Sequence, residues 1–386
     1  MTSSFKTYFK LAIDTCEAHS ATFPNLCALR PFSSMVKKIL QFLLFLGIGV
    51  SIMAWVFSSQ NTAFQEQCRL DGTPADQCSL MDKLLQDFGT VNLWWILAVL
   101  LAFTVSNIFR ALRWQMLLEP MGYRVRFSNA ILTILLGYFA NLFLPRMGEV
   151  VRAGSLARYE KVPMEKVMGT LVIDRLMDFL CLGLVVGLAF LLEGDTLWNF
   201  ITQQRGSNEG GSFFQNPWVL GFLAVSVLGL GMIYLLREKL AQIAMFQKIG
   251  KLLKGFADGL RSVFKLKQPG LFIGYSLGIW VMFYLQCWLN LLAFPPTAHL
   301  GMSAALMVFV FGTLGMVIPS PGGMGTFHAL CIAGLSLYGI QGSDGFSYAN
   351  IAFFAVQIFY NFAAGFLALG LLPRLNRGGR VENVEG

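Results

Sequence analysis

Long apolar segments, separated by short polar loops, follow one another along most of the chain. About 20 apolar residues in a helix cross a hydrocarbon core of roughly 30 Å. Six segments reach about that length and predict full transmembrane helices at 39–57, 92–112, 167–192, 217–236, 271–294 and 349–372. The pattern therefore predicts an all-α polytopic membrane protein.

Two further apolar stretches are each interrupted near their middle. One contains NLFLPRMGEVVR at 141–152, and the other contains VIPSPGGMGTFHA at 317–329. Proline and glycine break a helix and free backbone polar groups, which in a bilayer must be buried in protein or line a wet cavity. We therefore expect broken helical hairpins at 128–166 and 303–340, each re-entrant or formed by paired helices. The short matches MGE and MGT in the two breaks are compatible with an inverted repeat.

Composition agrees with this pattern, since 55% of the residues are hydrophobic and only 13% are charged. A soluble domain carries about 25% charged residues. The net charge of +8 is concentrated in particular loops. It therefore informs on topology and lipid contacts, and no nucleic-acid partner is expected.

Basic residues gather on one predicted side of the membrane. If both hairpins return to the side they entered from, 25 of the 29 Lys and Arg residues fall in 1–38, 110–127, 145–166, 237–270 and 373–386. By the positive-inside rule, these segments and both termini are cytoplasmic, and the protein lies in the inner membrane. One hairpin then opens from the cytoplasm and the other from outside. The predicted organisation is a cytoplasmic N-terminal tail 1–35, a transmembrane domain 36–372 and a short basic cytoplasmic tail 373–386.

The first break combines proline, glycine, an acid and arginines within an apolar context. A half-helix that starts there presents free N–H groups and its positive dipole end. Arg146 and Arg152 would bind lipid phosphate oxygens, while Glu149 would orient Arg152 or meet a headgroup amine. The alternative is a helix end anchored by interfacial arginines.

The second break is a glycine-rich turn, whose backbone amides can cradle an anion. The alternative is a kinked helix pair that packs closely through glycine. Because the two hairpins enter from opposite faces, we expect them to share one polar cavity. The predicted lipid-phosphate site comprises Asn141, Arg146, Glu149, Arg152, Pro321, Gly322, Gly323, Gly325 and Thr326.

Three charged residues, Asp174, Arg175 and Asp178, lie inside one predicted span. Charges in a membrane are costly and usually face the protein interior. Asp174 and Asp178 share a helix face. The group is either a polar patch or proton relay facing the hairpin site, or a structural ion-pair network with Arg110 and Arg113.

Cys68 and Cys78 lie in an acidic loop placed outside, where a disulfide is possible; two unbridged thiols are the alternative. The three histidines have no metal-ligand spacing, so no metal site and no cofactor are predicted. His328, inside the second break, is expected to be a hydrogen-bonded structural residue.

The segments RALRW (110–114), NLFLPRMGEVVRAGSLAR (141–158), DRLMD (174–178) and PSPGGMGTF (319–327) occur in this order. Together they resemble the lysylphosphatidylglycerol synthase transmembrane, or flippase-like, family over residues 36–372. The resemblance implies a membrane domain that handles lipids. In two-domain relatives this region moves an aminoacylated phospholipid that a soluble domain makes, and other relatives are attached to glycosyltransferases acting on polyprenyl phosphates.

Only 14 residues follow Leu372, so the aminoacyl-transferase activity is not expected of this chain. Many relatives carry an acid a few positions after the PGGxG turn, where this chain has His328, which puts a headgroup-amine contact from that acid in doubt.

We expect a protein that binds and translocates a lipid with a phosphate headgroup, such as a phospholipid or a polyprenyl-phosphate-linked lipid. Its partners would be lipids with anionic headgroups and a separate lipid-modifying synthase or glycosyltransferase. The alternative is a membrane-embedded transferase or accessory subunit acting on a lipid phosphate, and a third is a non-transporting partner that stabilises another membrane enzyme. A transferase needs a catalytic pair and a donor site. Only Asp174 and Asp178 are candidates for the pair, which favours a transporter over an enzyme.

Overall fold

The computed structural model describes residues 24–73, 78–143, 147–204, 263–318 and 320–376, which form helices and no strand. The longer helices are α2 (Pro24–Leu70), α3 (Leu80–Thr90), α4 (Leu93–Leu118), α5 (Phe127–Phe143), α6 (Met147–Glu160), α7 (Met164–Gln204), α11 (Pro269–Ala293), α12 (Met302–Val317), α13 (Thr326–Ser336), α14 (Gly342–Phe353), the π-helix η6 (Phe354–Tyr360) and α15 (Asn361–Leu375). The chain divides into two compact units, Met1–Ile48 and Gly49–Gly386. The second unit holds all the features described below.

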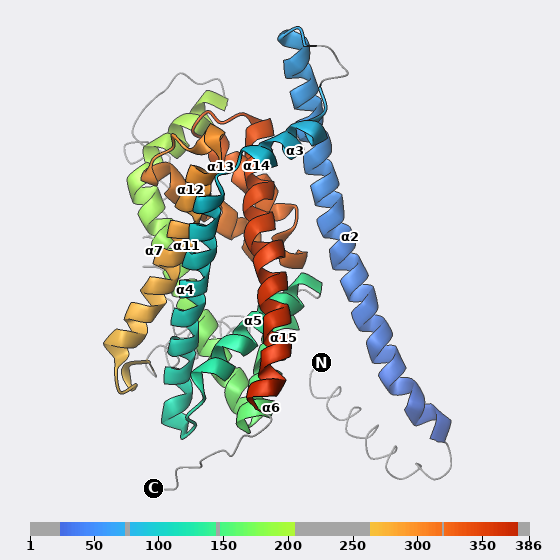
Figure 1. Cartoon of the computed structure of the whole chain (residues 1–386), viewed down its shortest axis with the longest axis vertical. Helices are drawn as coiled ribbons and strands as arrows, with labels where there is room; N and C mark the ends of the chain where they lie inside the picture. Colours follow the sequence, from blue (N-terminus) through green and yellow to red (C-terminus); the bar gives the residue numbers. More distant parts are fainter. Residues whose placement is uncertain (1–23, 74–77, 144–146, 205–262, 319, 377–386) are drawn as a thin grey trace, which may run out of the picture. The chain divides into compact units, whose positions relative to one another are not determined.

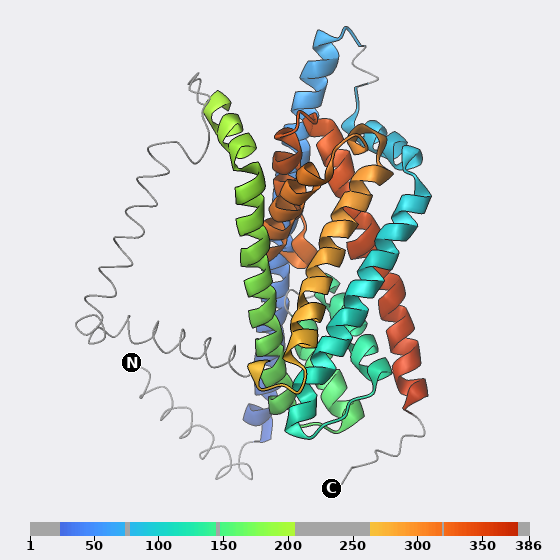
Figure 2. The same ribbon diagram turned by 90° about the vertical axis from the view of Figure 1, so that its left-hand side faces the viewer.

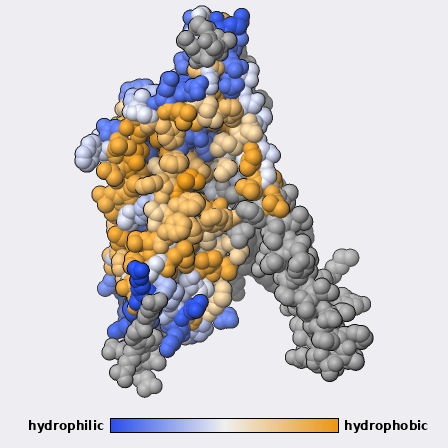
Figure 3. All heavy atoms as spheres, turned by 45° about the vertical axis from the view of Figure 1, so that its right-hand side comes forward, coloured by the Kyte–Doolittle hydropathy of each residue, from blue (hydrophilic) through white to orange (hydrophobic). Residues whose placement is uncertain are grey.

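Four helical segments of this unit are long and apolar enough to cross a membrane: Leu93–Met121, Met164–Asn199, Pro269–Ala293 and Gly342–Leu375. They confirm the spans predicted at 92–112, 167–192, 271–294 and 349–372. The predicted span 39–57 falls inside α2, whereas 217–236 lies outside the described residues. The chain is therefore an all-α polytopic membrane protein. Figure 3 agrees, since hydrophobic residues gather over the middle of the surface and hydrophilic ones at its two ends.

Local sequence signals set several helix boundaries. Asn92 begins α4, because its side-chain Oδ1 accepts from the Trp94 amide at 3.0 Å and so satisfies a free N–H of the first turn. Ser79 begins α3 in the same way, accepting from the Asp82 amide at 3.3 Å. At the other end of the chain, α14, η6 and α15 follow one another without a gap and form a single long span.

Both predicted hairpins are pairs of helices. The first consists of α5 and α6, whose connection 144–146 lies outside the described residues, and the second consists of α12 and α13. In Figure 1 the α5–α6 pair lies beside α15, whereas the α12–α13 pair lies beside α14 at the opposite end of this unit. The short turn η5 (Pro321–Gly323) of the second hairpin contacts α5, so the two hairpins meet.

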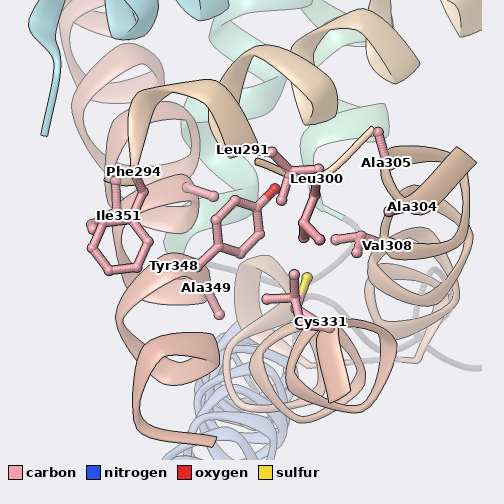
Figure 4. Packing of buried hydrophobic residues seen from close by; sticks show 12 residues of the cluster. Leu291, Phe294, Leu300, Ala304, Ala305, Val308, Cys331, Tyr348, Ala349 and Ile351 are labelled. Atoms are coloured by element: carbon pink, nitrogen blue, oxygen red, sulfur yellow. The ribbon is translucent and has the colours of Figure 1, made fainter. Parts of the chain in front are cut away.

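The middle of the unit is built on α4, which packs along α11, with α7 against both (Figure 2). Close approach of α4 and α11 depends on Gly278, where a Cβ atom would lie 2.9 Å from the ring of Phe109. A separate apolar cluster joins α11, α12, α13 and α14. Figure 4 shows Tyr348 pointing into this cluster toward Leu291, and its hydroxyl donates to the Cys287 carbonyl oxygen at 3.3 Å.

Candidate functional site

The charged residues of α4 and α7 form one buried ion-pair network. Arg113 Nη2 donates to Asp174 Oδ1 at 2.6 Å and to Asp178 Oδ1 at 2.8 Å. Arg110 Nη1 donates to Asp178 Oδ2 at 2.9 Å, and Ser276 on α11 accepts from Arg113 at 3.3 Å. The network predicted between these arginines and aspartates is therefore present, and it holds α4, α7 and α11 together.

Arg152, on α6, points into this network. Its Nη1 atom donates to Asp174 Oδ2 at 3.2 Å, and its guanidinium lies 3.8 Å from the centre of the Trp114 ring. The ring is held in turn by a bond of 2.9 Å from Trp114 Nε1 to Thr170 Oγ1. Stacking and pairing together explain how an arginine is buried here. Its Nε and Nη2 atoms are buried without a partner among the described residues.

Glu149 does not orient Arg152, as the sequence spacing suggested, but pairs with Arg175. Arg175 Nε lies 2.6 Å from Glu149 Oε1, and its Nη1 atom lies 3.7 Å from Asp178 Oδ2. The reason is that Arg152 stacks on Trp114 and pairs with Asp174, which leaves Glu149 to pair with Arg175 of α7. Both side chains of this pair remain partly exposed, 51% for Arg175 and 38% for Glu149.

The connected network contains four arginines, at 110, 113, 152 and 175, and three carboxylates, at 149, 174 and 178. Among the described residues, this network therefore has a net formal charge of +1. Each of these arginines has a carboxylate partner, but the network as a whole is not neutral, and excess charge inside a membrane is costly. Such a site is therefore suited to an anion that completes the pairing.

A cavity of about 520 Å³ borders this network. At one end it is lined by Arg110, Arg175 and Asp178, and its walls are mainly aromatic and aliphatic. Uncharged polar side chains also line it, from α5, α11 and η6: Tyr138, Gln286, Asn290 and Gln357. We did not single out these four from the sequence. Amides inside apolar spans, such as Gln286 and Asn290 spaced i, i+4 in 271–294, were the signal that could have revealed them.

The glycine-rich turn of the second hairpin is held by its own hydrogen bonds. Thr326 Oγ1 donates to the carbonyl oxygens of Gly315 and Gly323 at 2.8 and 3.2 Å. Gly322, Gly323 and Gly325 have φ values of 60°, 84° and 80°, which only glycine adopts without strain. The described cavity lining includes Met316, Val317 and Phe327, which flank the turn, rather than the residues of the predicted phosphate cradle, Pro321 to Thr326.

At the first break, Asn141 Oδ1 accepts from the Gly148 amide at 2.7 Å. One of the backbone groups freed by the break is thus satisfied inside the hairpin, and Asn141 caps α6. Arg146 lies outside the described residues. The predicted site is therefore divided: Asn141 and Thr326 stabilise the two breaks, while Arg152 and Glu149 join the ion-pair network beside the cavity.

The residues of the predicted disulfide are not joined in the structure. Cys68 is buried in the last turn of α2. Cys78 is also buried, and its Sγ atom lies 3.9 Å from the Thr73 carbonyl oxygen. The structure therefore agrees with the alternative, in which Cys68 and Cys78 are not bridged to each other.

The model of the lysylphosphatidylglycerol synthase transmembrane region matches residues 80–365. The chain belongs to this family. Over 102 residues it is 34% identical to a UPF0104 membrane protein of Methanocaldococcus jannaschii. That match covers 25% of this chain and 30% of the relative, so the chain spans under a third of the curated relative it matches. No solved structure matches the chain.

In this member of the lysylphosphatidylglycerol synthase transmembrane family, three segments far apart in the sequence meet at one place. RALRW supplies the arginines of α4, DRLMD the aspartates of α7, and the segment after the first break supplies Arg152. The network is thus the meeting point of three of the four segments that carried the resemblance. Membership in a lipid-related membrane family makes this the candidate lipid-binding site.

Proposed function

We propose that this protein binds a lipid with a phosphate headgroup and translocates it across the inner membrane, with both chain termini in the cytoplasm. The observation that carries the proposal is the buried network with one excess positive charge at the end of an apolar cavity. A phosphate beside Arg110 and Arg175 would complete the charge pairing, and charge-assisted bonds to arginine are among the stronger hydrogen bonds.

The walls of the cavity are suited to a lipid whose headgroup lies inside while its acyl chains stay in the bilayer. Phe179 on α7 and Val317 on α12 both line the cavity, yet they are 70% and 57% exposed. The cavity therefore opens between apolar side chains, through which a headgroup can enter while its chains remain among lipids. Because the α12–α13 turn meets α5, a shift of either hairpin would change access to the cavity.

Arg175→Gln tests the proposal, since Arg175 lines the cavity and is only partly buried. The protein is reconstituted in vesicles with phosphatidylglycerol carrying a fluorophore on its acyl chain, and dithionite is added outside. Wild-type protein is expected to make inner-leaflet fluorophore accessible, and Arg175→Gln to slow this about tenfold, as expected for one lost charge-assisted bond.

The matched control is Arg124→Gln, which removes an exposed arginine from the loop before α5 and is expected to keep the wild-type rate. If the folded wild-type protein neither binds anionic lipid nor makes the inner leaflet accessible, the proposed function is wrong. If wild-type protein does so and Arg175→Gln keeps its rate, the phosphate does not bind beside Arg175.

A further inference from the structure

One face of α11 carries a polar stripe along the cavity, beyond the ion-pair network. Trp280, Phe283, Gln286 and Asn290 all line the cavity and lie three or four residues apart, the spacing of one helix face. Phe283 marks the charged end, because the Arg110 guanidinium lies 5.9 Å from the centre of its ring. Gln286 and Asn290 lie one and two turns further along the helix.

Three polar atoms of this stripe are buried and have no hydrogen-bond partner among the described residues. They are the donor Trp280 Nε1 and the acceptors Gln286 Oε1 and Asn290 Oδ1. Asn290 Nδ2 donates to the main-chain carbonyl oxygen of Gln286 at 3.1 Å, which fixes the Asn290 side chain. Buried polar atoms in proteins are nearly always paired, so this set indicates an occupant with both donors and acceptors.

A π-helix brings a further amide to the same cavity. Gln357 lies in η6 and lines the cavity, and its Oε1 atom accepts from Asn361 Nδ2 at 3.2 Å. π-helical turns inside α-helices occur frequently at functional sites. The wide turn thus adds one more amide to the polar side chains that line the cavity.

The chemistry of this end of the cavity differs from that of the ionic end. Among the described lining residues, Arg110, Arg175 and Asp178 are the charged ones, and Asp178 already pairs with arginines. Trp280 lies one turn before Phe283, on the side of the ionic network, whereas the unpaired atoms beyond Phe283, Gln286 Oε1 and Asn290 Oδ1, both accept hydrogen bonds. A hydroxyl or an ammonium could donate to them, but no carboxylate among the described lining residues lies there to balance an ammonium charge. Neutral hydroxyl groups therefore match the stripe better than a cationic amine.

The geometry of α11 sets how long a headgroup must be to reach from the charged end of the cavity to Gln286 or Asn290. Gln286 and Asn290 follow Phe283 by three and seven residues, which at 1.5 Å per residue is roughly 5 and 10 Å along α11. A glycerol or a single polyol ring attached to a phosphate spans the shorter of these distances. The two ends are thus spaced for one headgroup, with its phosphate at Arg110 and Arg175.

We infer that the cavity selects lipids whose phosphate carries an uncharged, hydroxyl-bearing headgroup, and that Gln286 accepts a hydrogen bond from its hydroxyls, with Asn290 one turn further along α11 for a larger polyol. The inference rests on the proposed function, since it adds a hydroxyl subsite to the phosphate site. The inferred headgroup is a glycerol or a polyol ring rather than an aminoacyl or ethanolamine group.

The test compares three lipids with the same acyl chains, namely phosphatidic acid, phosphatidylinositol and phosphatidylethanolamine. Kd values are measured by native mass spectrometry of the full chain in detergent. Wild-type protein is expected to bind phosphatidylinositol about tenfold more tightly than phosphatidic acid, and phosphatidylethanolamine more weakly than both. The double variant Gln286→Leu/Asn290→Leu is expected to lower the ratio of the first two Kd values to about one.

Gln268→Leu makes the same substitution at an exposed position just before α11, and it should keep the tenfold ratio. A general loss of packing in the double variant would weaken both lipids together and leave the ratio at its wild-type value, which would overturn the inference. So would wild-type protein that binds phosphatidic acid as tightly as phosphatidylinositol. Failure to bind any of these lipids contradicts the proposed function itself.

Discussion

At the scale of single residues, Asp174 is the most deeply buried carboxylate of the network, with a side chain 1% exposed against 13% for Asp178. It is buried and accepts from Arg113 at 2.6 Å and from Arg152 at 3.2 Å. Asp174→Asn keeps the shape of the side chain but leaves the buried arginines with one carboxylate fewer. We expect a loss of about 3–5 kcal/mol in the free energy of unfolding, because removing one partner strands buried charge.

The measurement is denaturant or thermal unfolding of the purified protein in detergent. Asp71→Asn, at an exposed position just after α2, is the matched control and should change stability little. Equal unfolding curves for the two variants would mean that the network contributes nothing to stability.

At the scale of elements, the first hairpin depends on close contact between α5 and α6. A Cβ atom added at Gly148 would collide with the Gly137 carbonyl oxygen and with the Asn141 side chain. Backbone cannot yield as a flexible side chain can, so Gly148→Ala is expected to cost about 1–3 kcal/mol. Thermal unfolding in detergent measures this cost.

Gly154, on the same helix α6, has no atom within 4 Å of an added Cβ. Gly154→Ala is therefore the matched control, expected to be neutral or to stabilise the helix by about 0.5–1 kcal/mol. Similar losses for both variants would contradict the close α5–α6 contact.

A second element-scale link joins α3 to α14. Lys83 Nζ lies 2.8 Å from Asp87 and 2.7 Å from Asp344. Burial lowers the pKa of Lys83, but the two carboxylates raise it by more, so the pKa lies above its ordinary value. Below about 10.4, the pKa of lysine in an unfolded chain, these ion pairs therefore contribute fully to the stability of the folded state. Their contribution is lost as the pH rises through the higher pKa of Lys83 in the folded protein.

We expect Lys83→Met to cost roughly 1 kcal/mol at pH 7. The difference from wild type should shrink as the pH is raised above about 10.4, because the wild-type ammonium then loses its proton as well. Unfolding curves at pH 7 to 11 measure it, and a difference that grows with pH would show that the lysine acts through something other than its charge.

At the scale of the whole molecule, the charge distribution predicts the topology. Two exposed positions are suited to an introduced cysteine, namely Lys161, just after α6, and Gln341, just before α14. In a background whose native cysteines are replaced, an impermeant maleimide should label Gln341→Cys from outside. It should reach Lys161→Cys only after permeabilisation. Labelling of position 161 in intact cells would reverse the cytoplasmic placement of the first hairpin.

The sequence by itself determined the four spans that the structure confirms and the two breaks. Hydrophobic length and the effect of proline and glycine on a helix are local properties, readable at 92–112 or at Gly322–Gly325 without any neighbour. The same holds for the interior position of Asp174 and Asp178, because a membrane excludes charges that face lipid.

Only the tertiary structure decided which partners these residues have. Glu149 pairs with Arg175, and Arg152 stacks on Trp114, because α6 is turned toward α4 and α7 by its contact with α5. Gln286 and Gln357 are amides in otherwise apolar spans, and they share a cavity only because α11 and η6 both border it. Such pairings depend on how helices distant in sequence rotate against one another, which no local pattern specifies.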